Sequence, residues 1–164
     1  MKITTASSSR LTKFLGLLPV AMVLSAGSAA MAQTPPKSCQ KVSQQQIAGL
    51  FDRWNASLKT LDADKVVANY AADGILVATF ANEPLTKPAE IRGYFEHFLQ
   101  SKPQGAIDKR VIVVGCNTAE DVGTYTFTLQ DGSQVHARYN YIYEFTGGQW
   151  KIKLHHSSAM PVKG

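Results

Sequence analysis

The sequence lacks the short motifs that mark many catalytic sites. It contains no G-x-S-x-G nucleophile motif, no H-E-x-x-H zinc motif and no glycine-rich phosphate loop. Each of these motifs places a nucleophile, a metal ion or a phosphate group through its local geometry. The two cysteines are also not spaced as ligands of a zinc site. We therefore expect neither a metal ion nor a cofactor.

Clusters of basic residues are missing as well. The chain has 17 lysines and arginines against 12 acidic residues, which gives a formal net charge of +5. Lys2, Arg10 and Lys13 lie in the N-terminal segment, and without that segment the net charge is 14 − 12 = +2. Because nucleic-acid-binding domains carry a concentrated basic patch, we expect no nucleic-acid partner.

The N-terminal segment has the order of a secretory signal peptide. Its basic residues precede an apolar run from Phe14 to Ala26 and the sequence Ala30-Met31-Ala32. This run is shorter than the roughly 20 apolar residues that span a bilayer. We expect residues 1–32 to be removed on export to the periplasm or the extracellular space, with no membrane attachment afterwards. The remaining 132 residues (164 − 32) suffice for one domain.

The two cysteines, Cys39 and Cys116, both lie in the mature part of the chain. An oxidising compartment favours a disulfide between them. Two buried free thiols or a catalytic thiol are the alternatives. Neither cysteine has a neighbouring histidine or a C-x-x-C partner in the sequence, so we predict the disulfide.

Helical patterns occupy the first half of the mature chain. After a proline-containing tether at residues 33–42, Ser43 and Gln46 fit a capping box. Asp62 or Asp64 can cap a second short helix that ends near Gly74, before a strand over residues 75–79. A third helix begins around Pro88. Apolar residues recur at helical spacing in the first helix at Ile47, Leu50, Phe51, Trp54 and Leu58.

The second half of the mature chain alternates like strands. β-branched and aromatic runs cover residues 107–116, 122–129, 135–145 and 150–157. Asp131-Gly132 and Gly147-Gly148 are typical of hairpin turns. Helices followed by hairpin-linked strands indicate an α+β fold, in which the helices pack on one face of an antiparallel sheet.

Three segments carry a family resemblance. Residues 51–56 with 69–73, and residues 83–95, resemble the helices of the nuclear transport factor 2-like superfamily. Residues 148–152, His156-Ser157-Ser158 and Pro161 resemble the association domain of calcium/calmodulin-dependent protein kinase II. The resemblance implies a cone-shaped fold over residues 43–164, with three N-terminal helices on a curved antiparallel sheet. It also implies an exported homologue of a hub that assembles into rings and has a deep pocket.

The same resemblance shows departures from known sites. Where the superfamily's ketosteroid isomerases have an Asp base and a Tyr donor, this sequence has Ala78 and Trp54. Alanine cannot accept a proton, and an indole is a weak donor. Two positions of the kinase hub's arginine-rich pocket correspond to Tyr141 and Ser157. Neither isomerase chemistry nor an anionic ligand of the hub's kind is therefore favoured.

The histidine pair at the end of the chain attracts a functional interpretation. His155 and His156 are adjacent on a strand and point to opposite faces, so they cannot chelate one ion together. His156 follows Trp150, Ile152 and Leu154 at two-residue spacing. We expect His156 to face the core or a cavity, in either a structural or a working role.

A tyrosine ladder at Tyr139, Tyr141 and Tyr143 shares one face of the fourth predicted strand. It can line a cavity or form an interface with another subunit, where tyrosine is enriched. Arg138, on the other face, can bind a ligand carboxylate, or it can be exposed or paired.

These patterns predict an exported module without catalytic activity. We expect it to form at least a homodimer and to hold a small ligand in a cavity between helices and sheet. The predicted pocket residues are Trp54, Tyr125, Arg138, Tyr141 and His156. The alternative is an isomerase, cyclase or dehydratase that uses His156 as acid and base with Tyr125 or Tyr141 as a donor. A purely structural partner of another exported protein is a third possibility.

Overall fold

The computed structural model describes residues 38–161. The predicted signal peptide, residues 33–37 of the predicted tether and residues 162–164 lie outside the described residues. No helix within residues 38–161 combines the length and the apolar character needed to cross a membrane.

Three helices precede most of the sheet, and their start signals were predicted. Ser43 Oγ accepts a hydrogen bond from the Gln46 amide at 3.2 Å, and the Gln46 side chain accepts one from the Ser43 amide at 2.9 Å. Asp62 caps the second helix through the Asp64 amide at 3.0 Å, and Pro88 opens the third. The elements are α1 (Gln44–Leu58), α2 (Ala63–Val67), α3 (Pro88–Phe98) and the 3-10 turn η1 (Leu99–Ser101).

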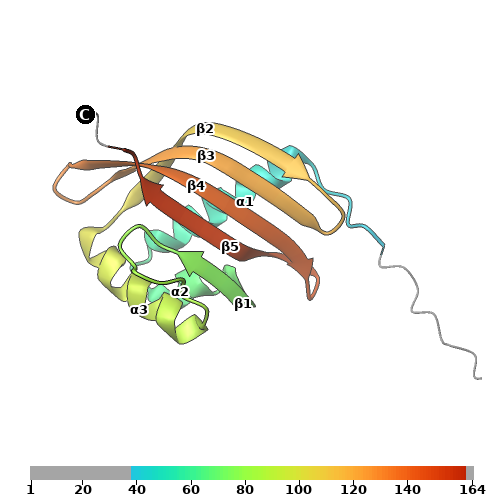
Figure 1. Ribbon diagram of the computed structural model, residues 1–164, viewed down its shortest axis with the longest axis horizontal. Coiled ribbons are helices and arrows are strands. Elements are labelled where there is room, and N and C mark those ends of the chain that lie inside the picture. The colour runs from blue at the N-terminus through green and yellow to red at the C-terminus, as the bar shows by residue number, and fades with distance from the viewer. Residues whose placement is uncertain (1–37, 162–164) are drawn as a thin grey trace, which may run out of the picture. The chain divides into compact units, whose positions relative to one another are not determined.

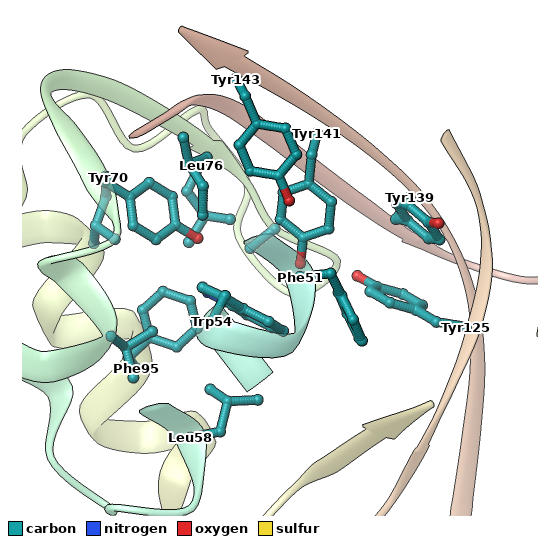
Figure 2. Packing of buried hydrophobic residues seen from close by; sticks show 14 of the residues in the cluster. Phe51, Trp54, Leu58, Tyr70, Leu76, Phe95, Tyr125, Tyr139, Tyr141 and Tyr143 are labelled. Carbon is teal, nitrogen blue, oxygen red and sulfur yellow. The ribbon is translucent and has the colours of Figure 1, made fainter. Parts of the chain in front are cut away.

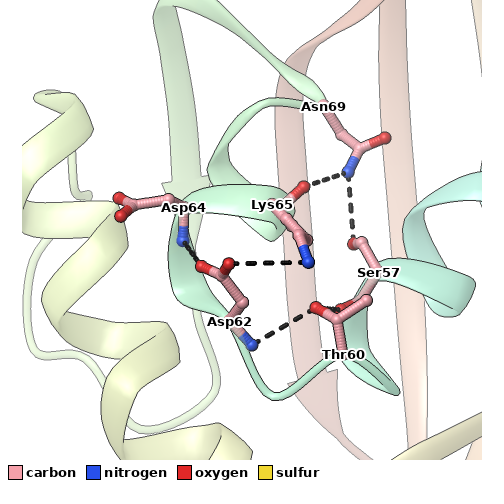
Figure 3. Close-up of polar contacts among 6 residues, drawn as sticks. All are labelled: Ser57, Thr60, Asp62, Asp64, Lys65 and Asn69. Atoms are coloured by element: carbon pink, nitrogen blue, oxygen red, sulfur yellow. Dashed lines mark hydrogen bonds and ion pairs between the residues drawn. The ribbon is translucent and has the colours of Figure 1, made fainter.

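The second helix ends at Val67, so the prediction that it runs to Gly74 is wrong. Asn69 is the reason (Figure 3). Its Nδ2 donates to the Lys65 carbonyl at 3.0 Å and to Ser57 Oγ at 3.2 Å. It also bonds to the Val66 carbonyl at 3.1 Å. These bonds satisfy carbonyls that a helix end leaves without partners. The chain then enters a strand directly.

Five strands form one sheet in the order β1-β5-β4-β3-β2 (Figure 1). The strands β2 to β5 are joined by antiparallel pairings as predicted, but β1 pairs with β5 in parallel. The sheet is therefore mixed. After β1 the chain passes through α3 and enters the sheet again as β2, at the opposite edge. The strands are β1 (Tyr70–Val77), β2 (Gln104–Val114), β3 (Thr118–Thr128), β4 (Gln134–Thr146) and β5 (Gln149–Ala159).

Aromatic side chains fill the space between the helices and the sheet (Figure 2). Trp54 of α1 is 1% exposed. It meets the rings of Phe95, Phe127 and Tyr141 edge-on, with centroid distances of 6.1, 6.2 and 5.8 Å. This edge-to-face geometry is favoured between aromatic rings. The core thus joins α1, α3, β3 and β4 around one indole, and the predicted α+β fold is confirmed.

A one-residue bulge in β5 decides which histidine is buried. Ile152 and Leu154 pair with successive residues of β4, which leaves Lys153 without a partner in the ladder. The alternation of faces shifts at that point. Ile152 and His155 therefore both face the core, at 1% and 3% exposure, and His156 is exposed. The prediction that His156 faces the core is wrong for this reason.

The predicted disulfide joins Cys39 to Cys116. Cys116 lies in the turn between β2 and β3, and the segment that precedes α1 is held there by the next residue. Asn117 Oδ1 accepts a hydrogen bond from the Gln40 amide at 2.7 Å, and its Nδ2 donates to the Ser38 carbonyl at 3.1 Å. The start of the described chain is thus fastened to one end of the sheet.

Replacing Cys39→Ser and Cys116→Ser together should lower the free energy of unfolding by about 3–4 kcal/mol. The disulfide closes a loop across a sequence separation of 77 residues, and its loss returns conformational entropy to the unfolded chain. Urea titrations of the oxidised wild type and the double variant measure the difference. Reduced wild type is the control and should unfold like the variant. Equal stability of the oxidised wild type and the variant would contradict the prediction.

Candidate functional site

A cavity of about 150 Å³ lies between the helices and the sheet. Its apolar walls come from α1, α3 and the core face of the sheet. Phe80, in the loop after β1, lines it while 80% exposed, and so marks its mouth. None of the side chains that line it is Lys, Arg, Asp or Glu. Aromatic residues form a large part of the wall, at Trp54, Tyr94, Phe95, Phe98, Tyr125 and Phe127.

His155 is a buried histidine in the wall of the cavity. Its Nδ1 is 2.9 Å from the Tyr70 hydroxyl, and its Nε2 is 3.4 Å from the Tyr125 hydroxyl. The ring stacks on Tyr141 with a centroid distance of 4.1 Å and meets the edge of Trp54 at 5.3 Å. Aromatic rings and hydroxyl groups therefore enclose the imidazole.

Burial among these rings lowers the pKa of His155 to about 3, with a smaller contribution from the neighbouring His156. Desolvation disfavours the charged form of a buried imidazole. His155 is consequently neutral at physiological pH. Burial also raises the pKa values of Tyr70 and Tyr125 well above their usual range, so both phenols stay protonated.

Two further hydroxyls extend the polar strip beside His155. Ser157 of β5 and Thr79 after β1 both line it, and their Oγ atoms are 3.1 Å apart. Ser157 reaches this wall because it lies two residues after His155 on the same face of β5. The cavity is thus an apolar space with a short strip of uncharged hydrogen-bonding groups.

Comparison with known protein families identifies the family of this chain. The model of the calcium/calmodulin-dependent protein kinase II association domain family matches residues 43–161. The chain belongs to this family. No protein with a curated description matches it significantly.

Solved structures agree with this assignment. A protein of Xanthomonas campestris, named as a candidate association domain of this family, is 44% identical, with a TM-score of 0.70 over 74% of this chain and 90% of its own. A Thiobacillus denitrificans protein with a similar name is 16% identical, with a TM-score of 0.60 over 70% and 94% of the two chains. A candidate dehydratase of the nuclear transport factor 2-like family from Streptomyces avermitilis is 14% identical, with a TM-score of 0.64 over 72% and 96%. These last two show the shared fold alone.

The predicted pocket residues of this association-domain chain divide into three groups. Trp54 and Tyr125 line the cavity. Tyr141 is fully buried and stacks behind His155 without lining it. Arg138 and His156 are exposed on the other face of the sheet, so neither belongs to the pocket. Arg138 instead donates a hydrogen bond to the Ala159 carbonyl at 3.3 Å.

Sequence reasoning missed His155. An uninterrupted alternation from Ile152 assigns Leu154 to the core and His155 to solvent. Leu154 is apolar although it lies on the opposite face, where it pairs with Ile142. Apolar residues on both faces hid the bulge, and no local signal in the sequence identifies it.

The charge of Arg110, a residue of β2 that does not line the cavity, is paired with Asp121. Its guanidinium contacts Asp121 through Nε–Oδ1 and Nη2–Oδ2 distances of 3.0 Å each. The Tyr139 hydroxyl donates to Asp121 Oδ1 at 2.8 Å. Burial raises the pKa of Asp121, and the bonds from Tyr139 and Arg110 oppose that change. This association domain therefore holds its inward arginine as an ion pair.

The stability of the domain should depend on pH through His155. Its folded-state pKa of about 3 lies below the ordinary value of about 6.5, so the unfolded chain binds the proton more tightly. The contribution is present above pH 6.5 and is lost as the pH falls toward 3. Between pH 7 and pH 4 it amounts to roughly 3 kcal/mol.

His155→Gln should remove this part of the pH dependence, and His156→Gln, a change at the exposed neighbour, should retain it. Urea titrations at several pH values give the slope of unfolding free energy against pH for each protein. A slope in His155→Gln as steep as in the wild type would contradict the prediction.

Proposed function

We propose that the chain is an exported, self-associating module that binds a small ligand in its cavity without converting it. The observation that carries the proposal is the cavity itself, an apolar space of about 150 Å³ with a neutral polar strip. Binding pockets are typically concave and apolar, with a few polar groups that orient the ligand. The small volume limits the ligand to about the size of one substituted ring.

The protonation states of the site favour binding over acid–base catalysis. An efficient general base has a pKa near the working pH, whereas the pKa of His155 is about 3. Ala78, the residue that corresponds to the isomerase base, lines the cavity with a methyl group. The alternative of an isomerase, cyclase or dehydratase depended on His156, which lies on the opposite face of the sheet from the cavity.

Export is supported by two independent features. The N-terminal segment has the composition of a signal peptide. The structure contains the disulfide Cys39–Cys116, and such bonds persist in oxidising compartments. Both features suit a periplasmic or secreted protein, with the mature chain beginning at Gln33.

Self-association is supported by the face of the sheet that the helices leave uncovered. Val111 and Val113 of the edge strand β2 are 61% and 58% exposed. Val111 pairs with Val122, and Ile142 pairs with Leu154 on the same face. An apolar sheet face of this kind is suited to a second copy of the chain, because proteins rarely expose large apolar patches without a partner.

Native mass spectrometry of the protein expressed with its N-terminal segment tests all three parts together. We expect a mass that begins at Gln33, a dimer or larger assembly, and a bound small molecule. An uncleaved chain would contradict export, and a monomer in light scattering would contradict self-association.

Filling the cavity should abolish ligand binding without unfolding the domain. Ala137 of β4 lines the cavity and is 2% exposed, so Ala137→Leu places three more carbon atoms near it. Saturation-transfer NMR with toluene and phenol as probes measures binding, and thermal unfolding reports the fold. Ala89→Leu, the same change at an exposed position of α3, is the control and should bind like the wild type. Equal probe binding by all three proteins would contradict a ligand role for the cavity.

A charge on the uncovered face should dissociate the assembly. Val111→Glu introduces a carboxylate that a buried interface would have to desolvate, and we expect a mass at least twofold lower by light scattering. Leu61→Glu changes another exposed apolar residue, in the turn between α1 and α2, and should leave the mass unchanged. Unaltered assembly of Val111→Glu would show that the interface lies elsewhere.

A further inference from the structure

The hydrogen bonds behind the cavity have a preferred direction. Tyr70 is 6% exposed, and its hydroxyl oxygen lies 2.9 Å from His155 Nδ1. Tyr70 does not line the cavity. Figure 2 shows Tyr70 and Tyr125 directing their hydroxyls into the core from opposite sides. The neutral His155 between them has one N–H to donate and one nitrogen that accepts.

The two tautomers of His155 leave different hydrogens unpaired. With the proton on Nδ1, His155 donates to Tyr70, and the Tyr70 hydrogen then has no acceptor in the apolar core. With the proton on Nε2, Tyr70 donates to Nδ1, and His155 donates to the Tyr125 oxygen. Each arrangement leaves one phenol hydrogen over. The second is favoured because its spare hydrogen belongs to Tyr125, which lines the cavity and can meet a ligand there, whereas a spare Tyr70 hydrogen would stay buried without an acceptor at a cost of about 1–3 kcal/mol.

This tautomer leaves the Tyr125 hydrogen available at the cavity wall. Ser157 and Thr79 also line the cavity, and the bond between their hydroxyls uses one of their two hydrogens. With the His155 N–H donating to Tyr125, the Tyr125 hydrogen and one hydrogen of the Ser157–Thr79 pair have no recipient among these groups. A bound molecule satisfies them best by bringing an acceptor, since no carboxylate of the protein lines the cavity.

The rest of the cavity defines the other properties of the ligand. Its lining contains no lysine or arginine, and Arg110 is already paired with Asp121. A charged ligand would be desolvated without an opposite charge, at a cost of several kcal/mol. The volume of about 150 Å³ matches that of a cavity known to bind benzene. Walls made of aromatic rings favour a ring in edge-to-face contact.

Resting on the proposed binding function, we infer that the ligand is an uncharged ring compound with one hydrogen-bond acceptor, such as an aromatic ketone or ester. Tyr125 donates to that acceptor, and His155 and Tyr70 orient Tyr125 from behind. The inference deepens the proposed function by assigning the ligand's charge, size and polarity.

Acetophenone and α-methylstyrene test the inference because they share a shape and differ in a carbonyl against a methylene group. Isothermal titration calorimetry gives the Kd of each compound for the wild type and for Tyr125→Phe. We expect the Kd of acetophenone to rise about three- to tenfold in Tyr125→Phe, the loss expected for one hydrogen bond. The Kd of α-methylstyrene should stay within about twofold. Benzoate, the anionic analogue, should bind the wild type at least tenfold more weakly than acetophenone.

Tyr143→Phe is the matched control, since it also removes a buried tyrosine hydroxyl but lies outside the cavity lining. It should change neither Kd. An independent measurement on the wild type is the infrared carbonyl band of bound acetophenone, which should lie at lower wavenumber than in hexane. This second reading holds even if Tyr125→Phe fails to fold.

The outcomes separate the inference from the function on which it rests. Binding of α-methylstyrene with no selective effect of Tyr125→Phe on acetophenone would overturn the acceptor inference and leave the binding function standing. Tighter binding of benzoate than of acetophenone would also overturn it. If neither neutral compound binds the wild type, both the inference and the proposed binding function are wrong.

Discussion

The structure depends on covering one face of a five-stranded sheet with few helices. Only α1 among the described helices is longer than 11 residues, and small aliphatic side chains would leave the distance to the sheet unfilled. Large rings meet this requirement. Trp54 reaches from α1 toward rings on β3, β4 and α3, and Phe51 contacts Tyr139 and Tyr141. Rings pack with fixed edge-to-face preferences, so a space remains where no ring fits, and that space is the cavity.

The same aromatic core sets the chemistry of the cavity. Each tyrosine on the core face brings a hydroxyl that must find a partner or remain unsatisfied. Tyr139 meets Asp121 and Tyr70 meets His155, whereas the hydroxyls of Tyr141 and Tyr143 have no partner among the described residues. Asp121 and His155 are therefore part of the structural solution to burying tyrosines. Burial also lowers the pKa of His155 to about 3, which makes it a poor candidate for proton transfer at neutral pH.

Much of the fold could be predicted from local patterns. Ser43, Asp62 and Pro88 mark helix starts by the hydrogen bonds they make or cannot make, and the periods of the apolar residues identify helices and strands. What could not be predicted depends on side-chain bonds and strand register that the apolar periods do not show. Asn69 ends α2 with its own side chain, and the bulge at Lys153 becomes visible only when β5 is paired with β4. Two residues of the candidate site, Trp54 and Tyr125, were predicted. His155 was missed because its orientation depends on that bulge.

The position of β5 has a consequence for the order in which the fold can form. Among the described strands, the one that the ribosome makes last, β5, lies between β1 and β4, so β1 has no neighbouring strand until residues 152–156 have been synthesised. Pairings between segments so far apart in sequence form slowly, because the long loop must close before contacts repay its entropy. A growing chain consequently remains incompletely folded until β5 has been made. That delay is compatible with the export proposed above, because a chain has to be unfolded to pass through a membrane channel.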